Sequence, residues 1–441
     1  MSTANAVSTR AAAGDGRTAF YKRVTGAALV LIALGCTVGV VVPAGLGWDF
    51  ANFYDAGHRV VARQTVDLYH QERPVAGGPT QGNMRFWGAP LSAALYAPLA
   101  FLRPELALIV FKLQNIMALA VALALLYRHC HRFLASDPAR SAAFSAMFAG
   151  LCLIYQPFWT TFRVGGQSTA TVMLLLVAAL HCYTAGRLRV TALLLVGAVM
   201  IKPTLVTLLV FLACVSGWPF VLALAIGTAF LALLSVAVMG WPIHVEFLRV
   251  LVEGSQLSRP WHFNSSLYVP LENLRLLRFT PAAAPGAAAA LLTLMWCVKC
   301  AVVAMFATIV RSSRRRDWPG PARRHFEFLM SVSFWLLISQ TLWEHYLAML
   351  FIPLIYIVAV RRWFPPTAHY LVGAICALCL GQNLILMELL WTRIDIQSAA
   401  GLIAIGLFKA GPLLFTLLLL WRYQASLFAS YTAPAWTSPS T

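Results

Sequence analysis

Long runs of apolar residues, separated by short polar segments, fill most of the chain between residues 24 and 421. A membrane-spanning helix needs about 20 mainly apolar residues, because each residue advances about 1.5 Å along the helix axis. Together with the turn and charge signals between them, these runs predict an all-α polytopic membrane protein with about twelve transmembrane helices. The predicted spans are 24–44, 104–127, 143–157, 168–185, 190–201, 203–215, 219–238, 286–310, 325–342, 347–360, 368–389 and 401–421.

Two segments depart from this simple pattern. The runs 190–201 and 203–215 are too short for two full spans, and Lys202-Pro203 separates them, which predicts a broken or tilted hairpin. The segment 86–102 is apolar but also short. We expect it to form a helix packed at the membrane interface, because a crossing there would invert every later loop.

Basic residues lie on one side of this predicted topology. The chain has 33 Lys and Arg against 15 Asp and Glu, a net charge of +18. Most of the excess falls in the segment 1–23 and in alternate short loops, as expected of cytoplasmic segments that face anionic lipid. We therefore expect no nucleic-acid partner. The loop and tail arginines are Arg128, Arg132, Arg140, Arg187, Arg189, Arg311, Arg314, Arg315, Arg316, Arg323, Arg324, Arg361, Arg362 and Arg422.

The topology divides the chain into three parts. A cytoplasmic N-terminal tail, 1–23, precedes a membrane domain, 24–421, and a cytoplasmic tail, 422–441, follows it. The predicted location is the cell (inner or plasma) membrane. Two long extracytoplasmic loops, about 45–103 and 240–285, contain many of the acidic residues. These loops are where we expect the active site to lie.

Several kinds of chemistry are disfavoured by the sequence. With 60% hydrophobic and 11% charged residues, the chain is too apolar for a soluble cofactor-binding fold. It has no P-loop, no G-x-G-x-x-G after a strand and no H-E-x-x-H. Cys297 and Cys300, and Cys376 and Cys379, have C-x-x-C spacing inside apolar runs, where packing explains them better than a metal or redox site. We expect no cofactor and no obligatory metal.

The first candidate site follows the first span. Asp49 lies at the membrane boundary beside Tyr54 and Asp55, among aromatic residues. Partial desolvation would raise the basicity of such a carboxylate and suit it to take a proton from a hydroxyl group. The alternative is a helix N-cap, for which aspartate is also common.

Two further candidates lie near predicted helix ends. Arg163 precedes a glycine turn and Gln167, so backbone N–H groups and a guanidinium are available to an anion there. A plain glycine turn is the alternative. Lys202 lies within the broken hairpin, and an ionisable residue at membrane depth is costly enough to indicate a function. Its alternative is an ammonium group that reaches the membrane surface.

Two more candidates lie in predicted outer connections. Trp343, Glu344 and His345 bring an indole, a carboxylate and an imidazole into one short connection, where an aromatic belt is the alternative. His262 and Asn264 belong to the second long loop, and aromatic, imidazole and amide side chains of this kind suit sugar recognition.

Taken in order along the chain, these motifs resemble the polyprenol-phosphate-sugar-dependent transferases of glycosyltransferase family 87, in the GT-C class. The resemblance implies that Asp49 is the catalytic base and that His345, with Lys202 or Arg163, holds the donor phosphate. The matching motifs are Asp49-Phe50 with Phe53-Tyr54, Pro90 and Pro98, Gly166-Gln167, Lys202-Pro203-Thr204, Asn264-Ser265-Ser266-Leu267, and Trp343-Glu344-His345-Tyr346 followed by Pro353.

The same resemblance extends to the substrates. It implies a polyprenyl-phosphate-sugar donor, with mannose as the first choice and arabinofuranose as the second, and a glycolipid or cell-envelope polysaccharide as the acceptor. The further donor-binding candidates are Gln167, Glu344, Asn264 and His262, and the secondary candidates are Asp55, Trp343 and Tyr54.

The mechanism expected from the residues is an inverting single displacement. A lipid phosphate is already a good leaving group, so one base for the acceptor hydroxyl is sufficient. Retention would need two carboxyl groups about 5 Å apart, and no paired acids occur at an obvious spacing. The alternatives are a lipid-linked-sugar transporter or flippase, although no internal repeat is present, and another envelope enzyme such as a ligase or acyltransferase.

Overall fold

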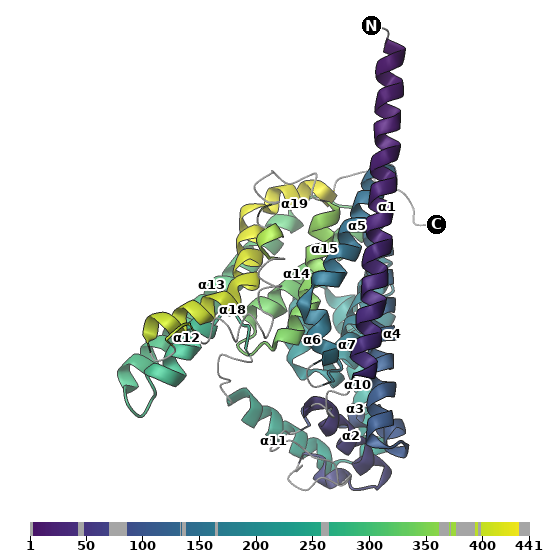
Figure 1. Ribbon diagram of the computed structural model, residues 1–441. Helices are drawn as coiled ribbons and strands as arrows, with labels where there is room; N and C mark the ends of the chain where they lie inside the picture. The colour runs from purple at the N-terminus through teal and green to yellow at the C-terminus, as the bar shows by residue number, and fades with distance from the viewer. Residues whose placement is uncertain are drawn as a thin grey trace.

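The computed structural model describes residues 3–42, 48–69, 86–132, 138–163, 166–256, 264–360 and 398–431, with a few isolated positions between them. The described residues are helical and contain no strand, apart from one isolated bridge between Asn264 and Trp343. The elements (Figure 1) are α1 (Thr3–Val41), α2 (Trp48–Val61), η1 (Thr65–Asp67), α3 (Pro90–Ala94), η2 (Ala97–Phe101), α4 (Pro104–His131), α5 (Pro138–Ile154), α6 (Gln156–Arg163), α7 (Thr169–Thr184), α8 (Leu188–Ile201), η3 (Pro203–Leu205), α9 (Val206–Ser216), α10 (Trp218–Met239), α11 (Pro242–Gln256), α12 (Val269–Asn273), η4 (Leu274–Arg278), α13 (Pro285–Arg314), α14 (Gly320–Ile338), η5 (Glu344–Leu350), α15 (Phe351–Ala359), α18 (Ala399–Arg422) and α19 (Gln424–Tyr431).

Five of the described helices are long and apolar enough to cross a membrane. They are Gly16–Val41 within α1, and α4, α10, α13 and α18. Shorter apolar helices of 10–17 residues are also present. This is the all-helical membrane architecture expected from the sequence, whereas the count of twelve crossings stays a prediction. Its span 368–389 lies largely outside the described residues.

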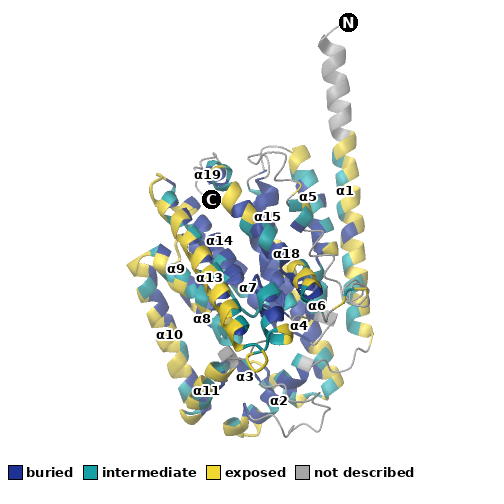
Figure 2. Ribbon diagram, turned by 90° about the vertical axis from the view of Figure 1, so that its left-hand side faces the viewer, coloured by how far each residue is buried: buried dark blue, intermediate teal, exposed yellow. Residues whose placement is uncertain are grey.

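Burial separates the central helices from those facing the surroundings. Helix α14 and the segment formed by η5 and α15 are almost wholly buried, whereas α10 and α13 expose large apolar side chains along their length (Figure 2). Exposed apolar faces on such long helices are the surface that a bilayer would cover. The core therefore centres on α7, α14 and α15, and α10 and α13 contribute their inner, buried positions to it.

The chain reverses at Lys202-Pro203, as the predicted hairpin requires. Helix α8 ends at Ile201, and Lys202 has an extended backbone because the proline ring disfavours a helical residue before it. Lys202 bonds to Gln167, just before α7 begins, whereas Ser216 at the end of α9 contacts Tyr183 near the end of α7. Helices α8 and α9 therefore run in opposite directions along α7, which confirms the break.

A smaller hydrophobic cluster covers one end of the bundle. It joins α2, α3, η2 and α11, at the bottom of Figure 1, to the start of α4. Gly57 of α2 lies so close to the chain at Tyr96 that a Cβ atom would come within 2.4 Å of the Tyr96 carbonyl oxygen. The segment 86–102 thus contains two short helices, α3 and η2, packed against α2.

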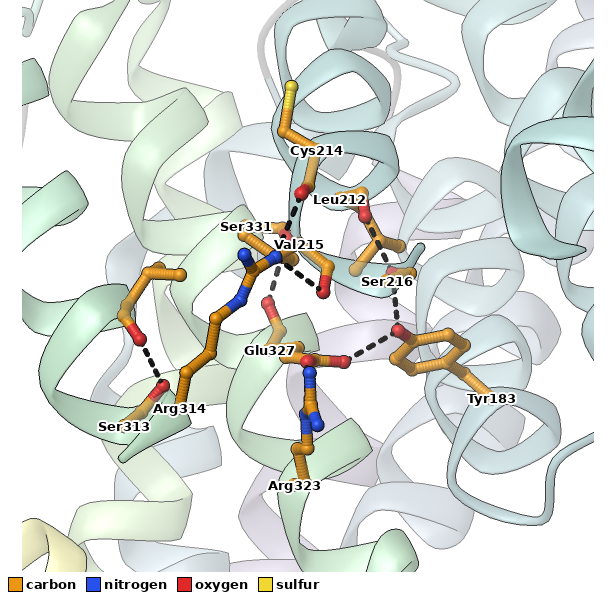
Figure 3. A network of polar contacts seen from close by, with 11 residues as sticks. Tyr183, Leu212, Cys214, Val215, Ser216, Ser313, Arg314, Arg323, Glu327 and Ser331 are labelled. Atoms are coloured by element: carbon orange, nitrogen blue, oxygen red, sulfur yellow. Dashed lines mark hydrogen bonds and ion pairs between the residues drawn. The ribbon is translucent and has the colours of Figure 1, made fainter. Parts of the chain in front are cut away.

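The opposite end collects the arginines and a buried carboxylate. Glu327 of α14 accepts hydrogen bonds from the Tyr183 hydroxyl at 2.8 Å and from Arg323 Nε at 2.9 Å (Figure 3). Arg314, at the end of α13, donates to the carbonyl oxygens of Cys214 and Val215 at the end of α9. These bonds tie the ends of four helices together.

Both predicted tails contain helix. Helix α1 begins at Thr3, so residues 3–23 of the predicted tail extend the helix of the first span. In segment 422–441, helix α19 buries Leu427, Phe428 and Tyr431 in the main core. The C-terminal segment therefore contributes to packing up to Tyr431.

Candidate functional site

Asp49 lies in the first turn of α2, where the positive end of the helix dipole favours a carboxylate. Its neighbour Phe50 packs directly on Gly166, the residue before Gln167. Gly166 has a φ of +66°, and a Cβ atom there would come within 2.8 Å of the Phe50 Cβ. The glycine turn thus permits the close approach that brings the start of α2 to the start of α7.

Gln167 links the acid to the hairpin lysine. Its Nε2 donates to Oδ2 of Asp49, and its Oε1 accepts a hydrogen bond from Lys202 Nζ at 3.1 Å. Both Gln167 and Lys202 are buried, with 5% and 7% of their surface exposed. The two bonds use the Nε2 and the Oε1 atoms of one amide group. They therefore fix the side chain of Gln167 between Asp49 and Lys202.

Lys202 also meets the fourth member of the group, His345. The Lys202 Nζ lies 3.4 Å from His345 Nε2 and 4.4 Å from the centre of the Tyr346 ring. An ammonium group is only a donor, so this contact needs the lone pair of His345 Nε2 as its acceptor, and burial with the Lys202 charge lowers the pKa of His345, which favours the neutral imidazole. The structure thus places four candidates from separate parts of the sequence in one chain of contacts: Asp49, Gln167, Lys202 and His345.

The environment of Asp49 changes its acidity. Burial raises the pKa of Asp49 to about 6, against the opposing effects of the Lys202 ammonium and the Gln167 hydrogen bond. Asp49 as a residue nevertheless keeps part of its surface exposed. Such a group is mostly ionised at neutral pH and is a stronger base than an ordinary aspartate.

The secondary candidates near Asp49 have structural partners. Asp55 is buried and accepts a hydrogen bond from Arg59 Nε at 2.8 Å, one helical turn along α2. The Tyr54 hydroxyl donates to the Leu102 carbonyl at 2.7 Å. The Tyr54 bond therefore holds α2 against the segment that follows η2, whereas the Asp55–Arg59 pair lies within α2.

Glu344 is paired with a residue that the sequence reasoning did not select. Lys409 of α18 donates to Glu344 Oε1, and both side chains are largely removed from solvent. The overlooked signal was a lysine inside the apolar run 401–421, the same kind of signal that selected Lys202. This pair connects α18 to the segment that carries His345.

Asn264 fastens the second long loop to the same segment. Its Oδ1 accepts from the backbone N–H groups of Ser266 at 3.0 Å and Leu342 at 2.9 Å, and its Nδ2 donates to the Gln340 carbonyl. Trp343 forms the backbone bridge to Asn264, and its ring lies parallel to that of His345 with centroids 6.5 Å apart. The amide of Asn264 is thus bonded to backbone groups, and its expected role in sugar binding stays a prediction.

Two predicted site residues fall outside what the structure describes. The backbone of Arg163 ends α6, but its side chain is not described, and His262 lies in the undescribed segment 257–263. Among the described residues, no group of three or more His, Cys, Asp and Glu side chains has the arrangement of a metal site. Cys297 and Cys300 lie exposed on α13.

The arrangement has the parts needed for attack by a hydroxyl group on a centre bonded to phosphate. A partly exposed base, Asp49, lies at one end, and a cation with an imidazole, Lys202 and His345, lies at the other. Comparison with known families matches residues 86–340 to glycosyltransferase family 87. The matched region includes Gln167 and Lys202. A search of curated proteins finds no match.

Proposed function

Because the chain belongs to glycosyltransferase family 87, we propose that it transfers a sugar, mannose, from polyprenyl phosphate to a hydroxyl of a glycolipid or cell-envelope glycan. The observation that carries the proposal is the contact chain from Asp49 through Gln167 and Lys202 to His345. In this proposal the twelve-span topology holds, the arginine-rich end faces the cytoplasm, and the site end with α2 faces outward.

Asp49 acts as the general base in the proposed reaction. Its carboxylate takes the proton of the acceptor hydroxyl while the hydroxyl oxygen forms a bond to the anomeric carbon. The bond from that carbon to the phosphate oxygen breaks, and polyprenyl phosphate leaves with the electron pair. The configuration at the anomeric carbon inverts, and Asp49 returns its proton to solvent. A pKa of about 6 supports this role, because the base is ionised at neutral pH.

Lys202 and His345 serve the leaving group. Negative charge grows on the phosphate as its bond to the sugar breaks, and a buried ammonium stabilises that charge more strongly than one in water does. Lys202 is buried and preoriented by Gln167 and by the Tyr346 ring. The Nδ1–H of His345 supplies a second donor. Lys202 and His345 thus stabilise the negative charge of the leaving phosphate.

The test is a transfer assay with the full-length protein in liposomes. Polyprenyl-phosphate-mannose with a labelled sugar is supplied with a lipid extract as acceptor, and GDP-mannose serves as the matched donor without a lipid carrier. We expect label to reach the acceptor only from the lipid-linked donor, with release of polyprenyl phosphate and an inverted anomeric configuration. Transfer from GDP-mannose alone, or a retained configuration, would contradict the proposal. Transfer from the arabinofuranose-linked donor alone would keep the reaction class and change the sugar.

A further inference from the structure

Helix α11 has apolar residues on two opposite faces. Ile243 and Val250 are buried in the smaller hydrophobic cluster, and Phe247 packs against it. At about 100° per residue, a second apolar row lies on the other side of the helix and begins one residue before it. This exposed row consists of Trp241, Val245, Leu248 and Val252, which are 66%, 39%, 61% and 59% exposed. The buried face explains how α11 packs on the protein, whereas a contiguous exposed row indicates another partner.

Charged side chains border the exposed row. Arg249 donates to Glu246 at 3.2 Å, and both lie between the exposed row and the buried face. The Arg249 side chain is itself 70% exposed, and Glu253 follows on the same side of the helix, also exposed. An apolar face bordered by charged residues is typical of a helix that lies in the membrane interface.

The exposed row continues the outward-facing side of α10, the candidate span before it. Helix α10 has 22 residues and is about 33 Å long, which matches a hydrocarbon core of about 30 Å. Exposed Trp218 begins α10 and exposed Trp241 follows it, and tryptophan is enriched at both membrane interfaces. The exposed apolar side chains between them are Leu222, Ile226, Phe230, Leu233, Leu234 and Val238. Trp241 therefore marks the level at which the span ends.

The turn after α10 directs α11 away from the span. Gly240 has a φ of +81° and ends α10. His244 donates from Nδ1 to the Gly240 carbonyl at 2.8 Å, and its Nε2 lies 2.8 Å from the Ser235 hydroxyl oxygen. Figure 1 shows α11 running obliquely to α1 and α4 across the lower end of the bundle. The helix thus remains at the end of the span instead of extending it.

The buried face of α11 connects it to the candidate site. The Phe247 ring stacks on Tyr69 with centroids 5.8 Å apart. Tyr69 belongs to the same cluster as Phe50 and Tyr54 of α2, the helix whose first turn carries Asp49. The position of α11 therefore bears on the position of α2.

We propose that the exposed row of α11 lies against a lipid surface, in the leaflet at the site end of the bundle. Its apolar side chains enter the acyl chains, and Arg249 lies at the level of the headgroups. Continuity with α10 favours lipid over a second copy of the chain, because the row extends a surface long enough for a bilayer to cover. Through the shared cluster, the contact holds Asp49 near the membrane surface, within reach of a lipid-anchored acceptor. That consequence rests on the proposed function.

The experiment identifies what the exposed row touches in liposomes of phosphatidylethanolamine and phosphatidylglycerol that contain the full-length protein. A photoreactive benzoylphenylalanine replaces Leu248, and matched variants carry it in place of Phe230 on α10 or Glu253 on the charged border. Mass spectrometry of the peptides identifies the adducts after illumination. We expect acyl-chain adducts at position 248 in a yield similar to that at position 230, and at least ~10-fold less at position 253, because an apolar side chain prefers lipid to water by at least this factor.

The other results at position 248 contradict the proposal. A cross-link to a second copy of the chain would assign the exposed row to a dimer, and a cross-link within the chain would show that another segment covers it. No adduct would mean that the row faces water. Val252 supplies a second position on the row if the Leu248 variant fails to fold. The adduct needs no turnover, so a failed transfer assay leaves the lipid contact intact and removes only its link to the acceptor.

Discussion

Each end of the helix bundle contains an acidic side chain in a polar network. The two networks differ in how many hydrogen bonds they donate to that carboxylate. At the arginine-rich end, Glu327 is buried and accepts hydrogen bonds from Tyr183 and Arg323 (Figure 3). At the site end, Asp49 accepts one from Gln167 and keeps part of its surface exposed. In the first network protein groups donate to both carboxylate oxygens of Glu327, whereas in the second Gln167 donates to one oxygen of Asp49.

The difference separates structural acids from reactive ones. A carboxylate with a tyrosine and an arginine on its oxygens holds helices together, and it has little capacity left for a substrate. Asp49 instead has a pKa raised to about 6 by burial, with a lysine two contacts away. The same residue chemistry thus serves packing at one end and, in the proposed mechanism, proton transfer at the other.

The largest expected effect comes from exchanging Asp49 for its amide. Asp49→Asn removes the base and should lower the transfer rate at least ~100-fold, while its thermal unfolding midpoint stays near that of the wild type. The rate is measured at equal amounts of inserted protein. An Asp49→Asn variant with the wild-type rate would move the base to another acid, with Asp55 and Glu344 as the candidates.

The pH dependence should give the next largest effect. A base works in its ionised form, so the rate falls as the pH drops through the pKa of Asp49. With a pKa of about 6, kcat/KM at pH 5 should be about tenfold below its value at pH 7. The profile is measured with saturating acceptor, and the residual activity of Asp49→Asn should lack this step. A flat wild-type profile down to pH 5 would contradict the assignment.

Gln167→Leu tests the polar network around Asp49 by removing its hydrogen-bond donor. It removes the donor that stabilises ionised Asp49, so the pKa of Asp49 rises and the midpoint of the profile moves to higher pH. A hydrogen bond to a charged group contributes about 1.5 kcal/mol, which lowers the rate at pH 6 about sevenfold. A lower rate with an unmoved midpoint would show that Gln167 acts on the substrate instead.

Glu327→Gln should have the smallest effect on transfer and a clear effect on stability. The change weakens the bonds to Tyr183 and Arg323, and charge-assisted hydrogen bonds contribute about 1.5–3 kcal/mol. We expect a lower thermal unfolding midpoint in detergent, a rate within about twofold of the wild type per folded protein, and an unchanged pH profile. A loss comparable with that of Asp49→Asn would show that the two ends are coupled.

The sequence also predicted which local features would carry the site, although not all of their partners. Lys202-Pro203 predicted a chain reversal, because proline restricts the residue before it, and the reversal is present. Lys409 and Lys299 carried the same signal of a cation in an apolar helix, but their partners Glu344 and Gln340 are distant in sequence. The sugar-binding role of Asn264 stays a prediction, and its backbone partners depend on how the loop folds, which the sequence does not show.

What the sequence determined by itself was local: apolar helices, their breaks, the one-sided arginines and the individual polar motifs. These follow from the about 20 residues that a span requires and from the cost of charge in an apolar environment. Tertiary structure alone decided that Gln167 would meet Asp49 and that Lys202 would meet His345, across 118 and 143 residues. Helix packing sets those distances through contacts such as Phe50 on Gly166, and no periodic pattern along the chain encodes them.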